Sequence, residues 1–115
     1  MVVERVVPNL PADSAGAGRG FFIGVLGMEV AMEHPFITTY RGAGGAVQLS
    51  VLADDPSGMR PDYSVGVDDV DACHARAVAQ GTPVVYGPAD EPWGVRRFFA
   101  CDPLGRIANI VQHRD

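Results

Sequence analysis

The chain has 115 residues, of which 47% are hydrophobic and 20% charged, and its formal net charge is -5 at pH 7. This length and composition predict one globular domain with a small hydrophobic core. The negative charge argues against a partner with a phosphate backbone. The 9 basic residues also form no stripe beyond the Arg96–Arg97 pair. We therefore expect no nucleic-acid partner.

Targeting and redox signals predict a cytoplasmic protein without a membrane partner. No apolar run reaches the roughly 18 residues that span a bilayer. The first ten residues include Glu4, Arg5 and Pro8, where a secretion signal needs an unbroken apolar segment. Cys73 and Cys101 lack the C-x-x-C spacing of a metal or redox motif, so we expect reduced thiols that serve for packing.

The first half of the chain predicts a strand, a helix and three further strands. A β-branched run at 2–10 ends at prolines, as a short strand does. Asp13 or Ser14 can cap a helix that runs to about Leu26 and stops at Gly27, although three glycines weaken its first half. Strands are expected at 28–33, 36–41 and 46–52, with a glycine-rich hairpin turn at 42–45.

The same order of elements repeats after a loop at 53–61. Alternating residues predict a strand at 63–67, and Asp68 or Asp69 can cap a second helix that ends before Gly81. That helix carries an apolar stripe at i, i+3, i+4, i+7 and i+8, formed by Val70, Cys73, His74, Ala77 and Val78. Strands at 83–86, 95–101 and 106–112 follow, with a turn at 102–105.

Two charged clusters in the second half have structural interpretations. Arg96 and Arg97 point to opposite faces of one strand, and each is expected to pair with an acidic neighbour. Asp68, Asp69 and Asp71 lie at a helix start, where carboxylates cap the backbone and favour the helix dipole.

Four sequence motifs resemble the glyoxalase/bleomycin-resistance/extradiol-dioxygenase proteins, the vicinal oxygen chelate superfamily. They are FFIGVLGMEV at 21–30, VDDVD at 67–71, EPWGVR at 91–96 and DPLG at 102–105, in the order and spacing of that family. The resemblance implies an α+β fold in which two βαβββ units, at about 3–52 and 62–112, form an incomplete barrel around a cleft. It also implies a homodimer. Function must be argued from the site, because this fold serves both metal enzymes and metal-free binders.

The metal positions of the family carry unusual residues here. In metal-dependent members, the first and last strands of each half supply one ligand each, and the motifs put these positions at or near Val7, Gln48, Asp62 and Asn109. Catalytic zinc, nickel or iron prefers imidazoles and carboxylates. The three histidines lie elsewhere, at His34, His74 and His113. We therefore expect no metal and no other cofactor.

The expected cleft suits a small-molecule ligand. Strand alternation turns Gln48, Ser50, Asp62 and Asn109 inward. The candidate ligand-binding residues are Asn9, Gln48, Ser50, Asp62, Trp93, Asn109, Phe36 and Tyr40. Trp93 either lines the pocket or seals a dimer interface. Aromatic faces together with a carboxylate favour a flat or cationic ligand.

Two classes of function follow from this cleft. The first is a metal-free binder without catalytic residues, which sequesters an aromatic or cationic antibiotic or metabolite as the bleomycin-resistance branch does; a biosynthetic accessory protein would have the same sequence features. The second is a lyase, isomerase or dioxygenase-like enzyme of the superfamily, with an unusual metal site or with Asp62 as a general base.

Overall fold

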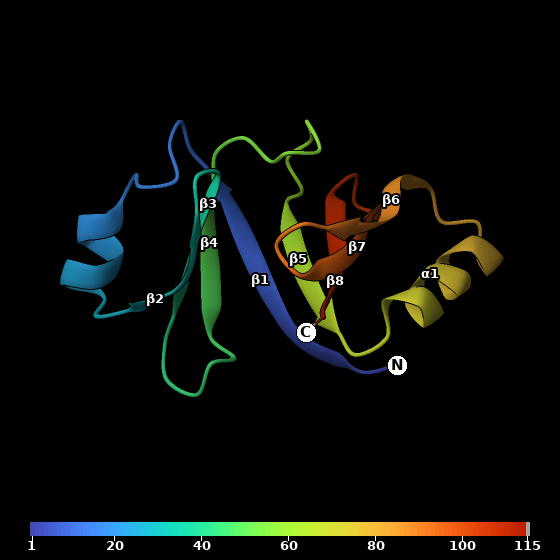
Figure 1. Ribbon diagram of the computed structural model, residues 1–115, viewed down its shortest axis with the longest axis horizontal. Coiled ribbons are helices and arrows are strands. Elements are labelled where there is room, and N and C mark those ends of the chain that lie inside the picture. Colours follow the sequence, from blue (N-terminus) through green and yellow to red (C-terminus); the bar gives the residue numbers. More distant parts are fainter. Residues whose placement is uncertain (115) are drawn as a thin grey trace. The chain divides into compact units, whose positions relative to one another are not determined.

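The computed structural model describes residues 1–114, which group into two compact units. Residues 7–60 form the N-terminal unit, and residues 1–6 together with 61–114 form the C-terminal unit. Strand β1 (Val3–Pro11) contributes to both units, so the boundary falls within a strand (Figure 1). The start of the chain thus belongs with the second half, which the repeat of elements in the sequence does not indicate.

The N-terminal unit is a sheet with the strand order β2-β3-β4-β1. Strands β2 (Glu29–His34), β3 (Ile37–Arg41) and β4 (Gln48–Leu52) are antiparallel neighbours, and β4 runs parallel to the end of β1. All three strands lie within two residues of the expected bounds. The hairpin between β3 and β4 uses glycines with positive φ at 44 and 45, as the glycine-rich turn predicts.

The first helix is shorter than the sequence predicts. It is a π-helix, η1 (Gly20–Val25), and it begins at Gly20 rather than after Asp13 or Ser14. Gly18 takes a φ of 79°, a value that interrupts a right-handed helix and that a glycine adopts readily. The expected stop at Gly27 is confirmed by its positive φ of 69°. Docking of Phe22 holds the short helix, since its ring centroid lies 5.0 Å from that of Tyr40.

The C-terminal unit has the strand order β1-β5-β8-β7-β6 and one α-helix. Its elements are β5 (Tyr63–Val67), α1 (Val70–Ala79), β6 (Val84–Glu91), β7 (Val95–Cys101) and β8 (Ile107–His113). Strand β5 is parallel to β8, whereas β6, β7 and β8 are antiparallel neighbours. Strand β6 continues to Glu91, past the expected end at Tyr86, because register shifts accommodate the Gly87-Pro88 pair.

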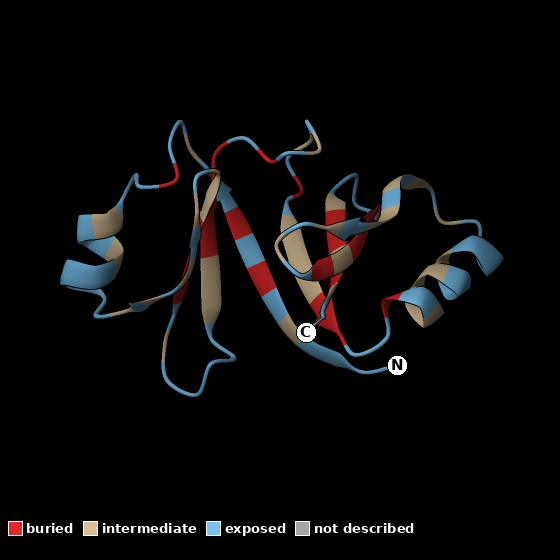
Figure 2. Ribbon diagram, viewed as in Figure 1, coloured by how far each residue is buried: buried red, intermediate tan, exposed pale blue. Residues whose placement is uncertain are grey.

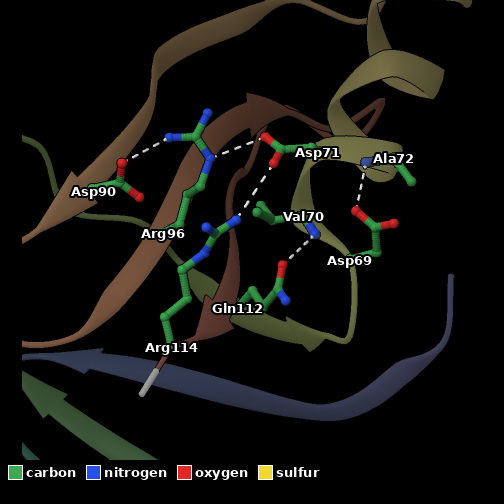
Figure 3. Close-up of polar contacts among 8 residues, drawn as sticks. All are labelled: Asp69, Val70, Asp71, Ala72, Asp90, Arg96, Gln112 and Arg114. Carbon is green, nitrogen blue, oxygen red and sulfur yellow. Dashed lines mark hydrogen bonds and ion pairs between the residues drawn. The ribbon is translucent and has the colours of Figure 1, made fainter.

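The N-terminus of α1 is capped from two elements, as Figure 3 shows. The Asp69 carboxylate accepts a hydrogen bond from the backbone N–H of Ala72 at 3.0 Å. The side-chain oxygen of Gln112, on β8, accepts another from the N–H of Val70 at 2.9 Å. These bonds satisfy two of the free N–H groups of the first turn, and the first of them confirms the capping role predicted for Asp69.

A charge network ties the start of α1 to the sheet. Arg96 donates from Nε to Asp71 at 3.0 Å and from Nη1 to Asp90 at 3.2 Å, and Arg114 also reaches Asp71 (Figure 3). The hydrogen bond from Arg96 holds the pKa of the Asp71 carboxyl below its ordinary value. The predicted pairing of Arg96 with acidic residues is confirmed.

The core of the C-terminal unit lies between α1 and the sheet. Its fully enclosed members are Val67, Val70, Phe98 and Ala100, packed by Val65, Cys73, Ala77, Val84 and Ile110. Figure 2 shows buried residues concentrated in the strands, while the outer side of α1 is exposed. Val78 does not join the predicted stripe, since 61% of it is exposed. No helix in the described part of the chain is long and apolar enough to cross a membrane.

Candidate functional site

The sheet of the C-terminal unit has one face toward α1 and one face away from it. Phe98 and Ile110 are partners across β7 and β8 and point toward α1. Because side chains alternate along a strand, Phe99 and Asn109, also partners, point the other way, as does Ser64 opposite Asn109 on β5. We call this second side the helix-distal face of the C-terminal unit.

Asn109 lies near the centre of the helix-distal face with half of its amide unsatisfied. Its Nδ2 donates to the Ser64 hydroxyl oxygen at 3.0 Å. Its Oδ1 is buried and has no hydrogen-bond partner within residues 1–114, while only 8% of the residue is exposed. Buried polar atoms are nearly always hydrogen-bonded. This carbonyl oxygen is therefore poised to accept a hydrogen bond from another molecule.

Asp62 lies on the same face, immediately before β5. Its Oδ2 accepts a hydrogen bond from the N–H of Ile107 at 2.8 Å, and its Oδ1 lies 4.0 Å from Nη1 of Arg106. Backbone pairing of Asp62 with Ile107 places the side chain about 7 Å, or two residues, from Asn109 along the strand. One carboxylate oxygen is thus already used to fix the edge of the sheet.

A buried ion pair surrounded by aromatic rings occupies the same face. Arg97 is 3% exposed, and its Nη2 lies 2.8 Å from Oε2 of Glu91, whose Oε1 accepts a hydrogen bond from Tyr86 at 2.9 Å. The Arg97 guanidinium carbon lies 4.8 Å, 5.0 Å and 5.4 Å from the ring centroids of Phe99, Trp93 and Tyr86. Burial raises the pKa of Tyr86, and the hydrogen bond to Glu91 raises it by a smaller amount.

This network was only partly visible in the sequence. The pairing of Arg97 with an acidic neighbour is confirmed, and the partner, Glu91, lies beyond the end of the strand expected at 83–86. The extension of β6 brings Glu91 beside Val95, close to Arg97 on the adjacent strand. Trp93 is half-buried and its ring is held against Arg97, so the ring is fixed in place by an internal contact.

The N-terminal unit brings two of its predicted site residues together. Asn9 and Ser50 are partners across β1 and β4, and both are buried. Thr39 is the partner of Ser50 on β3, with 2.7 Å between the two hydroxyl oxygens. These three polar residues share the face of their sheet opposite η1. Gln48 lies at the start of β4, where its Nε2 donates to the backbone oxygen of Gly45 at 2.5 Å.

The two aromatic candidates of the N-terminal unit lie elsewhere. Phe36 stacks on His34 in the turn between β2 and β3, with ring centroids 5.6 Å apart. Tyr40 packs against Phe22 of η1 on the face opposite Ser50, and none of it is exposed. The structure therefore does not group Tyr40 with Asn9 and Ser50, because residue 40 points away from the side on which residue 39 lies.

The family's metal positions do not offer a set of transition-metal ligands. Val7 is buried and has no donor atom, the Gln48 amide is bonded to its own hairpin, and Asn109 offers a neutral oxygen. Across residues 1–114, no three side chains of the His, Cys, Asp and Glu types are placed to hold a metal ion. Zinc, nickel and iron sites are built from imidazoles, thiolates and carboxylates, so these donors do not fit such an ion.

The order of elements and the paired parallel strands define an α+β protein made of strand–helix–strand units. The sequence matches the model of the Glyoxalase/Bleomycin resistance protein/Dioxygenase superfamily over residues 5–108, and the chain belongs to that family. The family resemblance and the fold class expected from the four motifs are thus confirmed. No curated protein matches the sequence significantly.

Solved structures of the same fold are similar along their whole length. A chain described as NAD-dependent benzaldehyde dehydrogenase from Legionella pneumophila has a TM-score of 0.77 and 15% identity, covering 95% of this chain and 99% of that one. Methylmalonyl-CoA epimerase from Mycobacterium tuberculosis has a TM-score of 0.73 and 20% identity, covering 98% and 88%. A glyoxalase/bleomycin resistance protein/dioxygenase superfamily member from Vibrio splendidus has a TM-score of 0.66 and 21% identity, covering 94% of this chain and 97% of that one. At these identities the similarity shows the fold alone.

Proposed function

We propose that this protein binds a small molecule without a catalytic metal, through the helix-distal face of its C-terminal unit. The observation that carries the proposal is the buried, unpartnered Oδ1 of Asn109. An isolated protein would gain stability by replacing such a group, since an unsatisfied buried acceptor costs about 1–3 kcal/mol. A ligand that donates a hydrogen bond to this oxygen gives the group a reason to be there.

The surroundings of Asn109 support a binding role. Ser64 fixes the orientation of its amide, and Phe99, which is fully buried on the same face, makes its surroundings apolar. Small-molecule sites are commonly apolar surfaces with a few precisely placed polar groups. Trp93, held against Arg97 in the same unit, remains a candidate for a further contact. The ligand is an antibiotic that the protein sequesters or a metabolite that it carries for a biosynthetic enzyme.

The alternative is an enzyme of the same superfamily. Methylmalonyl-CoA epimerases share the fold, which shows that the fold accommodates catalysis in other chains. In this chain Asp62 is the candidate general base, and the loss of a turnover in Asp62→Asn would favour the enzyme. The hydrogen bond from Ile107 to Asp62 argues for the binder, because it commits one carboxylate oxygen to the edge of the sheet.

Metal analysis and ligand screening together test the proposal. The protein is purified without chelator and its metal content is measured. Thermal unfolding is then followed in the presence of EDTA, with bleomycin, other DNA-binding antibiotics or aromatic metabolites added one at a time. We expect no stoichiometric transition metal and at least one compound that raises the unfolding temperature, because binding to the folded state stabilises it. A stoichiometric metal, or a stabilisation that EDTA abolishes, would contradict the proposal.

We also propose that the chain acts as a homodimer in the cytoplasm. Exposed apolar side chains on η1, with Phe21 at 53% and Val25 at 70%, support self-association, since such patches often mark protein interfaces. Both cysteines are free thiols, which suits a reducing compartment. Light scattering coupled to size-exclusion chromatography tests the dimer; a mass near 12.2 kDa at micromolar concentration would contradict it.

A further inference from the structure

Arg5 places a positive charge on the helix-distal face of the C-terminal unit. Gly66, on β5, follows Ser64 by two residues and therefore points to the same face. A Cβ atom built on Gly66 would lie 2.5 Å from both Cζ and Nη1 of Arg5. The guanidinium thus occupies the space that any other residue at position 66 would fill with its own side chain.

The guanidinium of Arg5 has no acidic partner in the described part of the chain, although Arg5 is half-buried. Other arginines of this unit do have one, since Arg96 binds Asp71 and Arg97 binds Glu91. A cation in a partly desolvated position gains most from an anionic partner, and the planar guanidinium matches carboxylate and phosphate groups with two parallel hydrogen bonds. A ligand can supply the anionic group that residues 1–114 do not.

The charges around Arg5 are compatible with an incoming anion. His113 lies close enough for Arg5 to contribute, after burial, to a lowered pKa of its imidazole, while Glu4 opposes that effect. A neutral imidazole does not repel the Arg5 guanidinium, and its N–H can donate a hydrogen bond to an anion. Glu4 is exposed, and neighbouring positions on a strand point to opposite faces. Asp62, the acid on the same face, is engaged by Ile107 and lies four residues before Gly66.

Asn109 and Arg5 offer a ligand one hydrogen-bond acceptor and one charged hydrogen-bond donor. Ser64 and Gly66 are paired in register with Asn109 and Val111. The Arg5 guanidinium, which lies over Gly66, is thus one same-face step, about 7 Å along β5, from Ser64, the hydrogen-bond partner of the Asn109 amide. The Asn109 oxygen can only accept a hydrogen bond, whereas the guanidinium can only donate. We propose that the ligand of this face is a small flat molecule with an anionic group that binds Arg5 and a hydrogen-bond donor that binds Asn109.

This inference rests on the proposed binding function and changes the expected charge of the ligand. Asp62 suggested a cationic ligand at the level of sequence, but its carboxylate is tied to the Ile107 backbone and lies near Arg106. Among residues 1–114, the guanidinium of Arg5 has no acidic partner on this face. Carboxylate and phosphate share the required chemistry, and the test separates them.

Calorimetric titration with four para-substituted benzenes tests the two anchors. 4-Hydroxybenzoate has both groups, 4-hydroxyphenyl phosphate replaces the carboxylate, 4-hydroxybenzamide removes the charge, and 4-methoxybenzoate removes the donor. We expect one of the two anions with a free hydroxyl to bind about tenfold or more tightly than the last two, as charge-assisted hydrogen bonds allow. The stronger of the two identifies the anionic group.

Two variants reach the guanidinium by different routes. Arg5→Met removes the charge, whereas Gly66→Ala keeps the charge but displaces the Arg5 side chain, whose Cζ and Nη1 would lie 2.5 Å and whose Cγ would lie 2.9 Å from the new Cβ. Both should reduce the affinity for the preferred anion about tenfold and leave that for 4-hydroxybenzamide unchanged. The controls are Arg76→Gln, an exposed arginine on α1, and Gly20→Ala, whose added Cβ meets nothing within 4 Å.

Three results would overturn the inference. The first is equal binding of 4-hydroxybenzoate and 4-hydroxybenzamide with shifts of the Ser64 and Asn109 amide signals in nuclear magnetic resonance spectra, and it leaves the proposed binding function intact. The second is unchanged anion affinity in Arg5→Met. The third is no binding of any of the four compounds to the wild type; the antibiotic and metabolite screen then decides the proposed function separately.

Discussion

Replacement of Asn109 with leucine should separate stability from binding. The substitution loses the hydrogen bond from Nδ2 to Ser64, worth about 1 kcal/mol net. It also removes the buried unpartnered Oδ1, whose burial costs about 1–3 kcal/mol. The free energy of unfolding should therefore stay unchanged or rise by up to about 2 kcal/mol, while binding to the helix-distal face is lost.

The assay is urea unfolding followed by circular dichroism, with and without the best compound of the thermal screen. Ser64→Ala is the matched control, because it deprives the Asn109 Nδ2 of its acceptor and should lower the free energy of unfolding by about 1–3 kcal/mol. A loss of more than about 1 kcal/mol in Asn109→Leu would refute the reasoning, since it would show that Oδ1 stabilises the folded chain. A site that costs stability is a common sign of function.

Three further predictions concern the C-terminal unit. Glu91→Gln should destabilise the protein by about 3–5 kcal/mol, because Arg97 is left as a buried charge, and the double variant with Arg97→Met should recover much of that loss in urea unfolding. The hydrogen bond to Asp102 raises the pKa of Tyr63 to about 12, so its stabilising effect should be present at neutral pH and disappear as the pH rises from 10 toward 12; ultraviolet titration of tyrosinate, with Tyr63→Phe as the reference, measures this. Phe98→Ala should cost about 3–5 kcal/mol, whereas a loss below 1 kcal/mol would contradict its place in the core.

The sequence predicts the strands well because each carries a strong local signal. Strands β5 and β7 have the expected bounds, and the turn after β7 forms where Asp102 accepts hydrogen bonds from the N–H groups of Leu104 and Arg106. The first helix is less predictable. Its apolar pairs indicate a helix, but they do not show that the backbone hydrogen bonds follow the π-helical pattern. The glycines before the helix also leave its start undetermined.

The site is less predictable than the fold, because it depends on pairing across strands. Alternation correctly separates Ser50 from Leu49 and Asn109 from Ile110, but it cannot give the register that puts Asn109 beside Ser64. In the sequence, Arg5 stands out only as a charge where a secretion signal needs apolar residues. Its position over Gly66 requires β1 to lie beside β5, a long-range pairing that no local pattern in the sequence encodes.

The most direct test of the account is an amide chemical-shift map of the protein in EDTA, titrated with the best compound of the thermal screen. Metal-free binding on the helix-distal face predicts concentration-dependent shifts at Ser64, Phe99 and Asn109, with α1 unaffected. Shifts that arise only after zinc or iron is added, or that centre on α1, would contradict it.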